Sequence, residues 1–116
     1  MTRKSLKVGT WGISISLFLF VFSYSCALAD EEIRLTIKEN RFIPQEIKVK
    51  ADTKITLIVK NEDQAAEEFE SASLRLEKLI RPGGTITLHV FPLKPGTYEF
   101  MGEFHSDTAR GRLIVE

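Results

Sequence analysis

Cysteine and histidine are almost absent from this sequence of 116 residues, which contains one cysteine, Cys26, and two histidines, His89 and His105. A single cysteine cannot form a disulfide within the chain, so packing alone must stabilise the fold. Catalysis by a serine, histidine and aspartate triad also lacks its parts. His105, Ser106 and Asp107 are consecutive, whereas the members of a triad converge from separate elements. The sequence therefore argues against a disulfide-rich scaffold and against a hydrolase.

Acidic residues are absent from the first 29 positions. This segment has basic residues at positions 3, 4 and 7, an apolar stretch over residues 8–22, and Ala27-Leu28-Ala29 before an acidic run. That order is typical of a signal peptide, and it predicts export and cleavage after Ala29. An uncleaved anchor is an alternative, because residues 8–29 are long enough to span a bilayer. A lipoprotein signal is disfavoured, because Ser23 stands three positions before Cys26, where leucine is expected.

Without this signal, residues 30–116 form one acidic domain with 13 basic and 16 acidic side chains. We expect no nucleic-acid partner, since its lysines fall at outward positions of predicted strands. Pro82-Gly83-Gly84 is interpreted as a turn, not as a phosphate-binding loop. His89 lies at an outward strand position and is interpreted as a surface residue. The outward lysines are Lys48, Lys50, Lys54 and Lys60.

Apolar residues alternate with polar ones along most of this domain, which is the periodicity of strands and not of helices. Turn-forming residues separate the alternating segments. Short, evenly spaced strands predict an all-β fold, an antiparallel β-sandwich in a single domain. The predicted inward residues are Ile33, Leu35, Ile37, Ile47, Val49, Ala51, Ile55, Leu57, Val59, Ile86, Leu88, Val90, Tyr98, Phe100, Leu113 and Val115.

Residues 64–80 are the exception to this pattern. By propensity alone, residues 65–68 and 74–80 could be helical. We expect a loop or a short helical turn first, and then a strand that includes Leu74, Leu76, Lys78 and Ile80. The turn at residues 82–84 would join that strand in a hairpin to the strand that begins near Thr85.

Three segments resemble the cupredoxin family: NRFIPQEI at 40–47, ITLIVKN at 55–61 and LKPGTYEF at 93–100. EEFES at 67–71 and GEFH at 102–105 are similar to the small EfeO-type domains associated with periplasmic iron uptake. The resemblance implies a Greek-key β-sandwich of eight or fewer strands, with any metal at the end that carries these last two segments. It also implies an iron permease or another iron-uptake component as partner.

The blue-copper ligands of this family have few counterparts here. By the resemblance, the first histidine falls on Glu67, the cysteine on Gly102 and the second histidine on His105. The axial methionine would fall near Ala109 or Arg110, where the sequence has none. A type 1 centre requires two imidazoles and a thiolate. The resemblance therefore implies a cupredoxin without a blue-copper centre.

Five residues are candidates for a metal site at this end: Glu67, Glu68, Met101, Glu103 and His105. Alternation along a strand does not decide which of the two adjacent glutamates faces inward. Imidazole and carboxylate ligands suit copper(II), zinc or iron, whereas a thioether favours copper(I). The alternative is that the glutamates form a solvated loop and that the methionine only packs.

We therefore expect a periplasmic metal-binding module for a copper or iron ion, without catalytic activity, that accompanies iron transport. A metal-free interaction domain that docks a membrane permease or a peroxidase-like partner is the alternative. Ferroxidase activity is poorly supported by one loop histidine. Contact with a membrane is expected only through an uncleaved N-terminal segment.

Overall fold

The computed structural model describes Gly9, Gly12, residues 15–22 and residues 30–116 of the chain. Cys26 and the predicted cleavage point after Ala29 lie outside these residues. Among the described residues, no helix is long and apolar enough to cross a membrane. Regular structure within them begins at Asp30.

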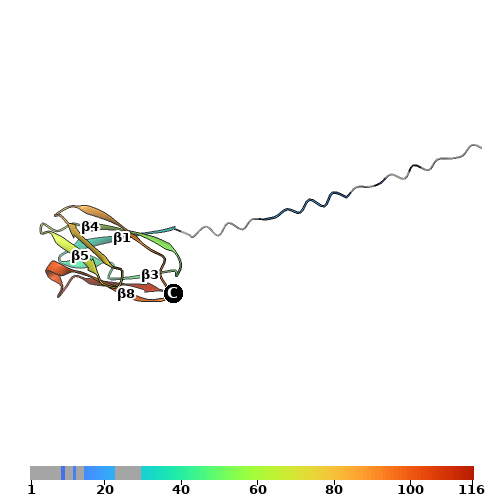
Figure 1. Ribbon diagram of the computed structural model, residues 1–116. Coiled ribbons are helices and arrows are strands. Elements are labelled where there is room, and N and C mark those ends of the chain that lie inside the picture. The colour runs from blue at the N-terminus through green and yellow to red at the C-terminus, as the bar shows by residue number, and fades with distance from the viewer. Residues whose placement is uncertain (1–8, 10–11, 13–14, 23–29) are drawn as a thin grey trace, which may run out of the picture.

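The described residues form a β-sandwich of nine strands and one short 3₁₀ turn (Figure 1). One sheet has the strand order β2-β1-β4-β7, and the other has the order β3-β9-β8-β5-β6. The prediction of a single all-β sandwich is confirmed. The elements are β1 (Asp30–Lys38), β2 (Arg41–Ile43), β3 (Glu46–Val49), β4 (Lys54–Asn61), β5 (Glu67–Ser71), β6 (Leu76–Ile80), β7 (Thr85–Val90), β8 (Gly96–Gly102), η1 (Glu103–His105) and β9 (Arg110–Val115).

Two strand pairs are parallel, so the expectation of an antiparallel sandwich is wrong for them. β1 runs parallel to β4 with Ile33 opposite Leu57, and β3 runs parallel to β9 with Ile47 opposite Leu113. Alternation along a strand assigns its two faces but does not identify its neighbour. The expected limit of eight strands is also wrong, because nine strands form, among them the short β2, which has only three residues.

Most residues that alternation placed inward are buried in the core, which also contains Phe42, Phe69, Ile80 and Ala109. The exceptions are partly buried and pack against the core: Ile47, Ala51, Ile86 and Tyr98. Leu57 and Val59 on β4 and Leu113 on β9 are fully buried, whereas the four outward lysines and His89 are exposed. Three phenylalanines, Phe42, Phe69 and Phe100, fill the space between the sheets, with ring centroids 5.0 to 6.0 Å apart. The predicted core and the predicted surface positions are therefore confirmed.

Residues 64–80 form two strands instead of a loop followed by one strand. The loop or helical turn predicted at the start of this segment is wrong at Glu67–Ser71, which forms β5. The predicted strand is confirmed as β6 from Leu76 to Ile80, but Leu74 lies in the preceding turn and the predicted hairpin with β7 is wrong. β6 pairs with β5, and the turn at residues 82–84 carries the chain to β7 in the other sheet.

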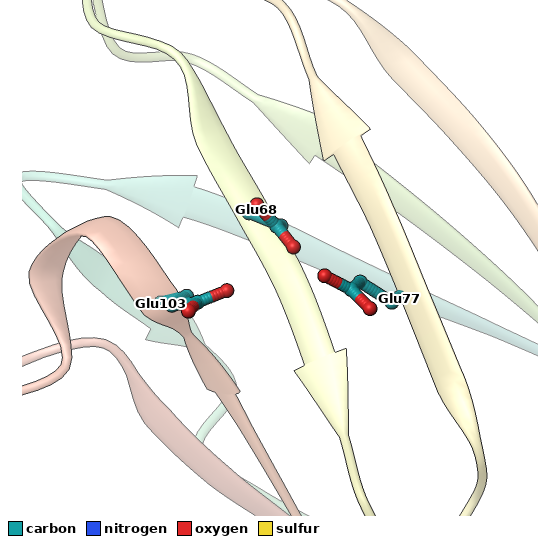
Figure 2. A group of neighbouring side chains, drawn as sticks. All are labelled: Glu68, Glu77 and Glu103. Atoms are coloured by element: carbon teal, nitrogen blue, oxygen red, sulfur yellow. The ribbon is translucent and has the colours of Figure 1, made fainter.

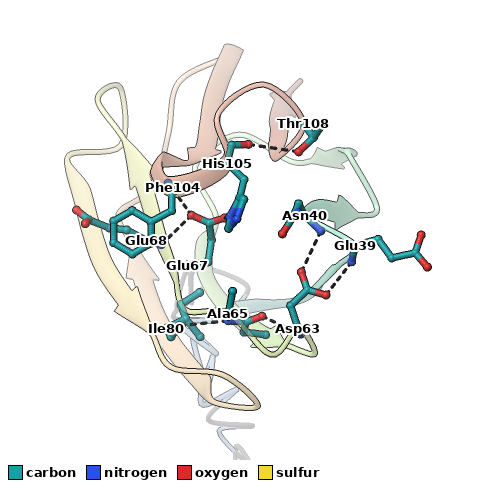
Figure 3. A network of polar contacts seen from close by, with 11 residues as sticks. Glu39, Asn40, Asp63, Ala65, Glu67, Glu68, Ile80, Phe104, His105 and Thr108 are labelled. Carbon is teal, nitrogen blue, oxygen red and sulfur yellow. Dashed lines mark hydrogen bonds and ion pairs between the residues drawn. The ribbon is translucent and has the colours of Figure 1, made fainter.

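A buried asparagine shapes the connection that leads into β5. Asn61, at the end of β4, donates from Nδ2 to the carbonyl oxygens of Ala65 (2.8 Å) and Ile80 (3.2 Å). Its Oδ1 accepts the N–H of Asp63 at 3.0 Å. One side chain thus joins β4 of the first sheet to the end of β6 in the second. This connection sets where β5 begins, and therefore where Glu67 lies (Figure 3).

Candidate functional site

Glu67 points into the sandwich and meets His105 (Figure 3). Its Oε2 lies 2.6 Å from Nδ1 of His105. Because a carboxylate only accepts hydrogen bonds, Nδ1–H of the imidazole donates to it. Glu67 is 1% exposed, whereas the side chain of His105 is 30% exposed. The pair therefore extends from the interior to the surface at this end of the sandwich.

The second carboxylate oxygen of Glu67 is also engaged. Oε1 accepts the backbone N–H of Phe104 at 2.9 Å and that of Glu68 at 3.0 Å. The carbonyl oxygen of His105 accepts the N–H of Ala109 at 2.8 Å, which closes the turn that presents the imidazole. The carboxylate consequently joins the first residues of β5 to η1 through three hydrogen bonds, two from backbone N–H groups and one from an imidazole.

Gly102 lies directly beside this carboxylate. A Cβ atom at position 102 would lie 2.5 Å from Cδ of Glu67 and 2.8 Å from Cβ of Ala109. The backbone of Gly102 is extended, with φ of −91° and ψ of 110°, a conformation open to any residue. Glycine is therefore required here by space and not by backbone conformation.

A second cluster lies on the outer face of the five-stranded sheet. Glu68 of β5, Glu77 of β6 and Glu103 of η1 come from three elements, and a carboxylate oxygen of each lies within 4.8 Å of the others. Figure 2 shows the three side chains pointing toward one another. We call these three residues the outer carboxylate cluster.

The structure divides the five predicted ligands between two faces of the sheet. Glu67 and His105 face the interior, and Glu68 and Glu103 belong to the outer carboxylate cluster. Met101 pairs with Glu70 where β8 runs beside β5. It precedes the buried Gly102 and faces the other side of the sheet. The sequence did not decide which of the two adjacent glutamates faces inward. In the structure, Glu67 points inward and Glu68 points outward.

Two acidic residues of the outer face, Glu70 and Glu77, were not among the predicted metal ligands. Glu77 belongs to the outer carboxylate cluster, and Glu70 lies directly opposite it in the pairing of β5 with β6. The alternation of Glu68 with Glu70 around a buried Phe69 was a signal for a shared outer face. Glu77 had no such signal, because its place depends on the register of β6.

The crowding of carboxylates perturbs their protonation. A hydrogen bond with Glu77, partial burial and the charge of Glu103 raise the pKa of Glu68 to about 7. The charge of Glu103, followed by burial, raises the pKa of Glu70 above its ordinary value. The outer face thus retains protons at a pH where isolated carboxyl groups have lost them. A bound cation would remove the same repulsion.

The stability of the metal-free protein is expected to fall as the pH rises from about 5 to about 8. Glu68 has a pKa of about 7 in the folded state against an ordinary 4.5, so the folded state holds a proton that the unfolded chain releases. This contribution is complete below pH 4.5 and is lost as the pH rises through 7. Urea unfolding at both ends of the range measures it. Glu77→Gln should weaken the dependence, and an unchanged dependence in that variant would contradict the assignment.

Known proteins share both the sequence and the fold of this chain. The profile of the family described as the cupredoxin-like domain matches residues 12–115. An uncharacterized protein of Rickettsia prowazekii (strain Madrid E), RP394, is 48% identical over 119 residues, which cover 97% of this chain and 95% of the relative. The resemblance to the cupredoxin family inferred from the sequence is confirmed.

Solved structures agree with this at the level of the fold. Auracyanin A, a "blue" copper protein of Chloroflexus aurantiacus, superposes with a TM-score of 0.65 at 17% identity, over 76% of this chain and all of that one. The metal binding domain of the Cu(I) exporting P-type ATPase CopA of Streptococcus pneumoniae D39 gives 0.64 at 12% identity, over 78% and 96% of the two chains. Because the residues that match the family profile include every strand of the sandwich, the chain belongs to the cupredoxin-like domain family.

Proposed function

We propose that this protein is a periplasmic metal-binding module that holds a copper(II) or iron ion at the outer carboxylate cluster and accompanies iron transport. The observation that carries the proposal is the convergence of Glu68, Glu77 and Glu103 from three separate elements. A hydrogen bond with Glu77, burial and the charge of Glu103 together raise the pKa of Glu68 to about 7. A cation placed among the three carboxylates would replace their mutual repulsion with attraction. The fold, shared with copper-binding proteins, supports the same class of function.

The residues inside the sandwich do not fit a type 1 copper ion. Such a centre needs a thiolate and two imidazoles, and residues 30–116 contain no cysteine. At the three positions that correspond to those ligands stand Glu67, Gly102 and His105, and the carboxylate of Glu67 fills the space beside the glycine. The proposed site is therefore on the outer face.

Oxygen ligands narrow the class of cation. Carboxylates bind hard and borderline ions, whereas copper(I) prefers thiolate and thioether sulfur. Met101 lies beside Glu70 and is not a member of the cluster. Iron is the ion that the resemblance to EfeO-type domains implies. We propose binding without catalysis, because the cluster offers ligands but no separate acid or base.

Calorimetric titration of the purified protein tests this proposal. Iron(II) without oxygen, manganese(II), copper(II), zinc(II) and copper(I) would be added in turn. We expect saturable binding of one ion per chain for a hard or borderline cation, and its loss in Glu68→Gln/Glu77→Gln/Glu103→Gln. A triple variant at exposed glutamates outside the cluster changes the net charge equally and should bind as the wild type does. The control substitutions are Glu39→Gln, Glu62→Gln and Glu99→Gln.

Two results would contradict the proposal in different ways. Equal loss of binding in both triple variants would mean that net charge, and not the cluster, attracts the ion. Absence of binding for every ion would favour the second candidate, a metal-free interaction domain that docks a membrane permease or a peroxidase-like partner. The occupation of the interior by Glu67 and His105 favours that candidate, because those residues need no ion to satisfy them.

A further inference from the structure

We infer that the Glu67 carboxylate is a built-in substitute for a metal ion: it fastens β5 to η1 from the interior and keeps that position closed to metals. This inference is independent of the proposed function, which concerns the opposite face of the sheet. It is carried by the contacts of one buried side chain and by the glycine beside it.

The contacts of Glu67 are those of a bridging centre. Two donors, the N–H of Phe104 and Nδ1–H of His105, come from η1, which lies 37 and 38 residues further along the chain. The third donor is the N–H of Glu68 on β5 itself. A metal ion bound by both segments would also hold β5 and η1 together. In this chain the carboxylate of Glu67, which is part of β5, holds them together by accepting hydrogen bonds. In a shielded interior, such charge-assisted hydrogen bonds are strong.

The same contacts close the position to an ion. Both oxygens of Glu67 are engaged, so a metal that binds there would have to displace the N–H donors that they now accept. Nδ1 of His105 is likewise committed to the carboxylate. Ion binding would therefore lose the present hydrogen bonds of the pair, and no thiolate is present to offset that loss.

Gly102 and Glu67 are matched to each other. A side chain at position 102 would begin 2.5 Å from Cδ and 2.7 Å from Oε2 of Glu67, so the two cannot both be accommodated without movement. Backbone conformation does not require a glycine there. The glutamate and the glycine thus form one arrangement, in which the carboxylate occupies the room that a side chain at position 102 would take.

A double-mutant cycle followed by thermal unfolding tests this match. Gly102→Ala is expected to lower Tm by roughly 10 °C, because its methyl group collides with the carboxylate and Ala109. In a Glu67→Ala background, the additional effect of Gly102→Ala should be smaller, since the carboxylate is gone and only the contact with Ala109 remains. Additive losses would overturn the inference. Gly111→Ala, whose methyl group would meet Phe100 instead, serves as the matched control and should add to Glu67→Ala without coupling.

A spectroscopic test asks whether Glu67 excludes a metal from the interior. The full chain carrying Glu67→His and Gly102→Cys presents two imidazoles and a thiolate, and should become intensely blue with copper(II). Gly102→Cys alone should stay without that colour, because the carboxylate still fills the position. A blue single variant, or a folded but colourless double variant, would overturn the inference. If the double variant does not fold, the thermal cycle decides.

Discussion

Replacing Phe69 by alanine is expected to lower the free energy of unfolding by about 4 kcal/mol, within the range observed for buried phenylalanines. Phe69 is fully buried on β5. Its ring stacks on that of Phe100 with centroids 5.3 Å apart, and meets the edge of Phe42 at 6.0 Å. Phe42 belongs to one sheet and the other two rings to the second sheet, so a cavity at this point removes packing contacts between the two sheets.

Urea unfolding measures this change, and Phe91→Ala is the matched control. Phe91 is 86% exposed, so its loss should alter the free energy of unfolding by less than about 0.5 kcal/mol. Because β5 also carries Glu67 and Glu68, cation binding by the Phe69 variant should disappear in the same temperature range as its fold. A loss below about 1 kcal/mol would mean that the aromatic cluster can close around the gap.

The sequence predicts the core of this fold well, because a strand's pleat fixes which residues share a face. Ile55, Leu57 and Val59 were assigned to the interior by alternation alone, and all three are buried. Alternation holds no information on partners, so the parallel pairing of β1 with β4 was missed. The partner of a strand depends on how the chain crosses between the sheets.

β5 was missed for a different physical reason. Its residues are mainly acidic, and a glutamate such as Glu67 is normally assigned to the surface because burying a charge is costly. That cost is offset by hydrogen bonds to Phe104 and His105, which lie more than 35 residues away in the sequence. Only the folded chain brings these donors together.

The candidate site was predictable in part. Glu68 and Glu103 were among the predicted ligands, but Glu77 was not, because its position follows from the register of β6 against β5. At position 102 the sequence indicates only that a cysteine is missing. The carboxylate of Glu67 fills the space beside Gly102 because the Glu67 side chain points inward. Alternation did not decide that direction.

Asn61→Ala is expected to destabilise the protein by about 3 kcal/mol, because several buried polar groups would lose their partners at once. The carbonyl oxygens of Ala65 and Ile80 would lose the Nδ2 donor, and the N–H of Asp63 would lose its acceptor. Asn61 is fully buried, so water cannot easily replace these contacts. Urea unfolding measures the loss. A cost within about 0.5 kcal/mol of zero, the range of ordinary surface substitutions, would contradict it.

Asn61→Asp separates the contribution of the donor from that of shape, since the two side chains have the same size. The new carboxyl group keeps an acceptor for Asp63 but can donate to only one of the two carbonyl oxygens, and only while protonated. Folding then requires a proton that the unfolded chain releases above about pH 4. Relative to the wild type at each pH, this variant should therefore lose further stability between pH 4 and pH 8, whereas Asn61→Ala should show a constant loss. Parallel curves for the two variants would mean that the amide fills space at the junction of the two sheets but does not hold them together through its hydrogen bonds.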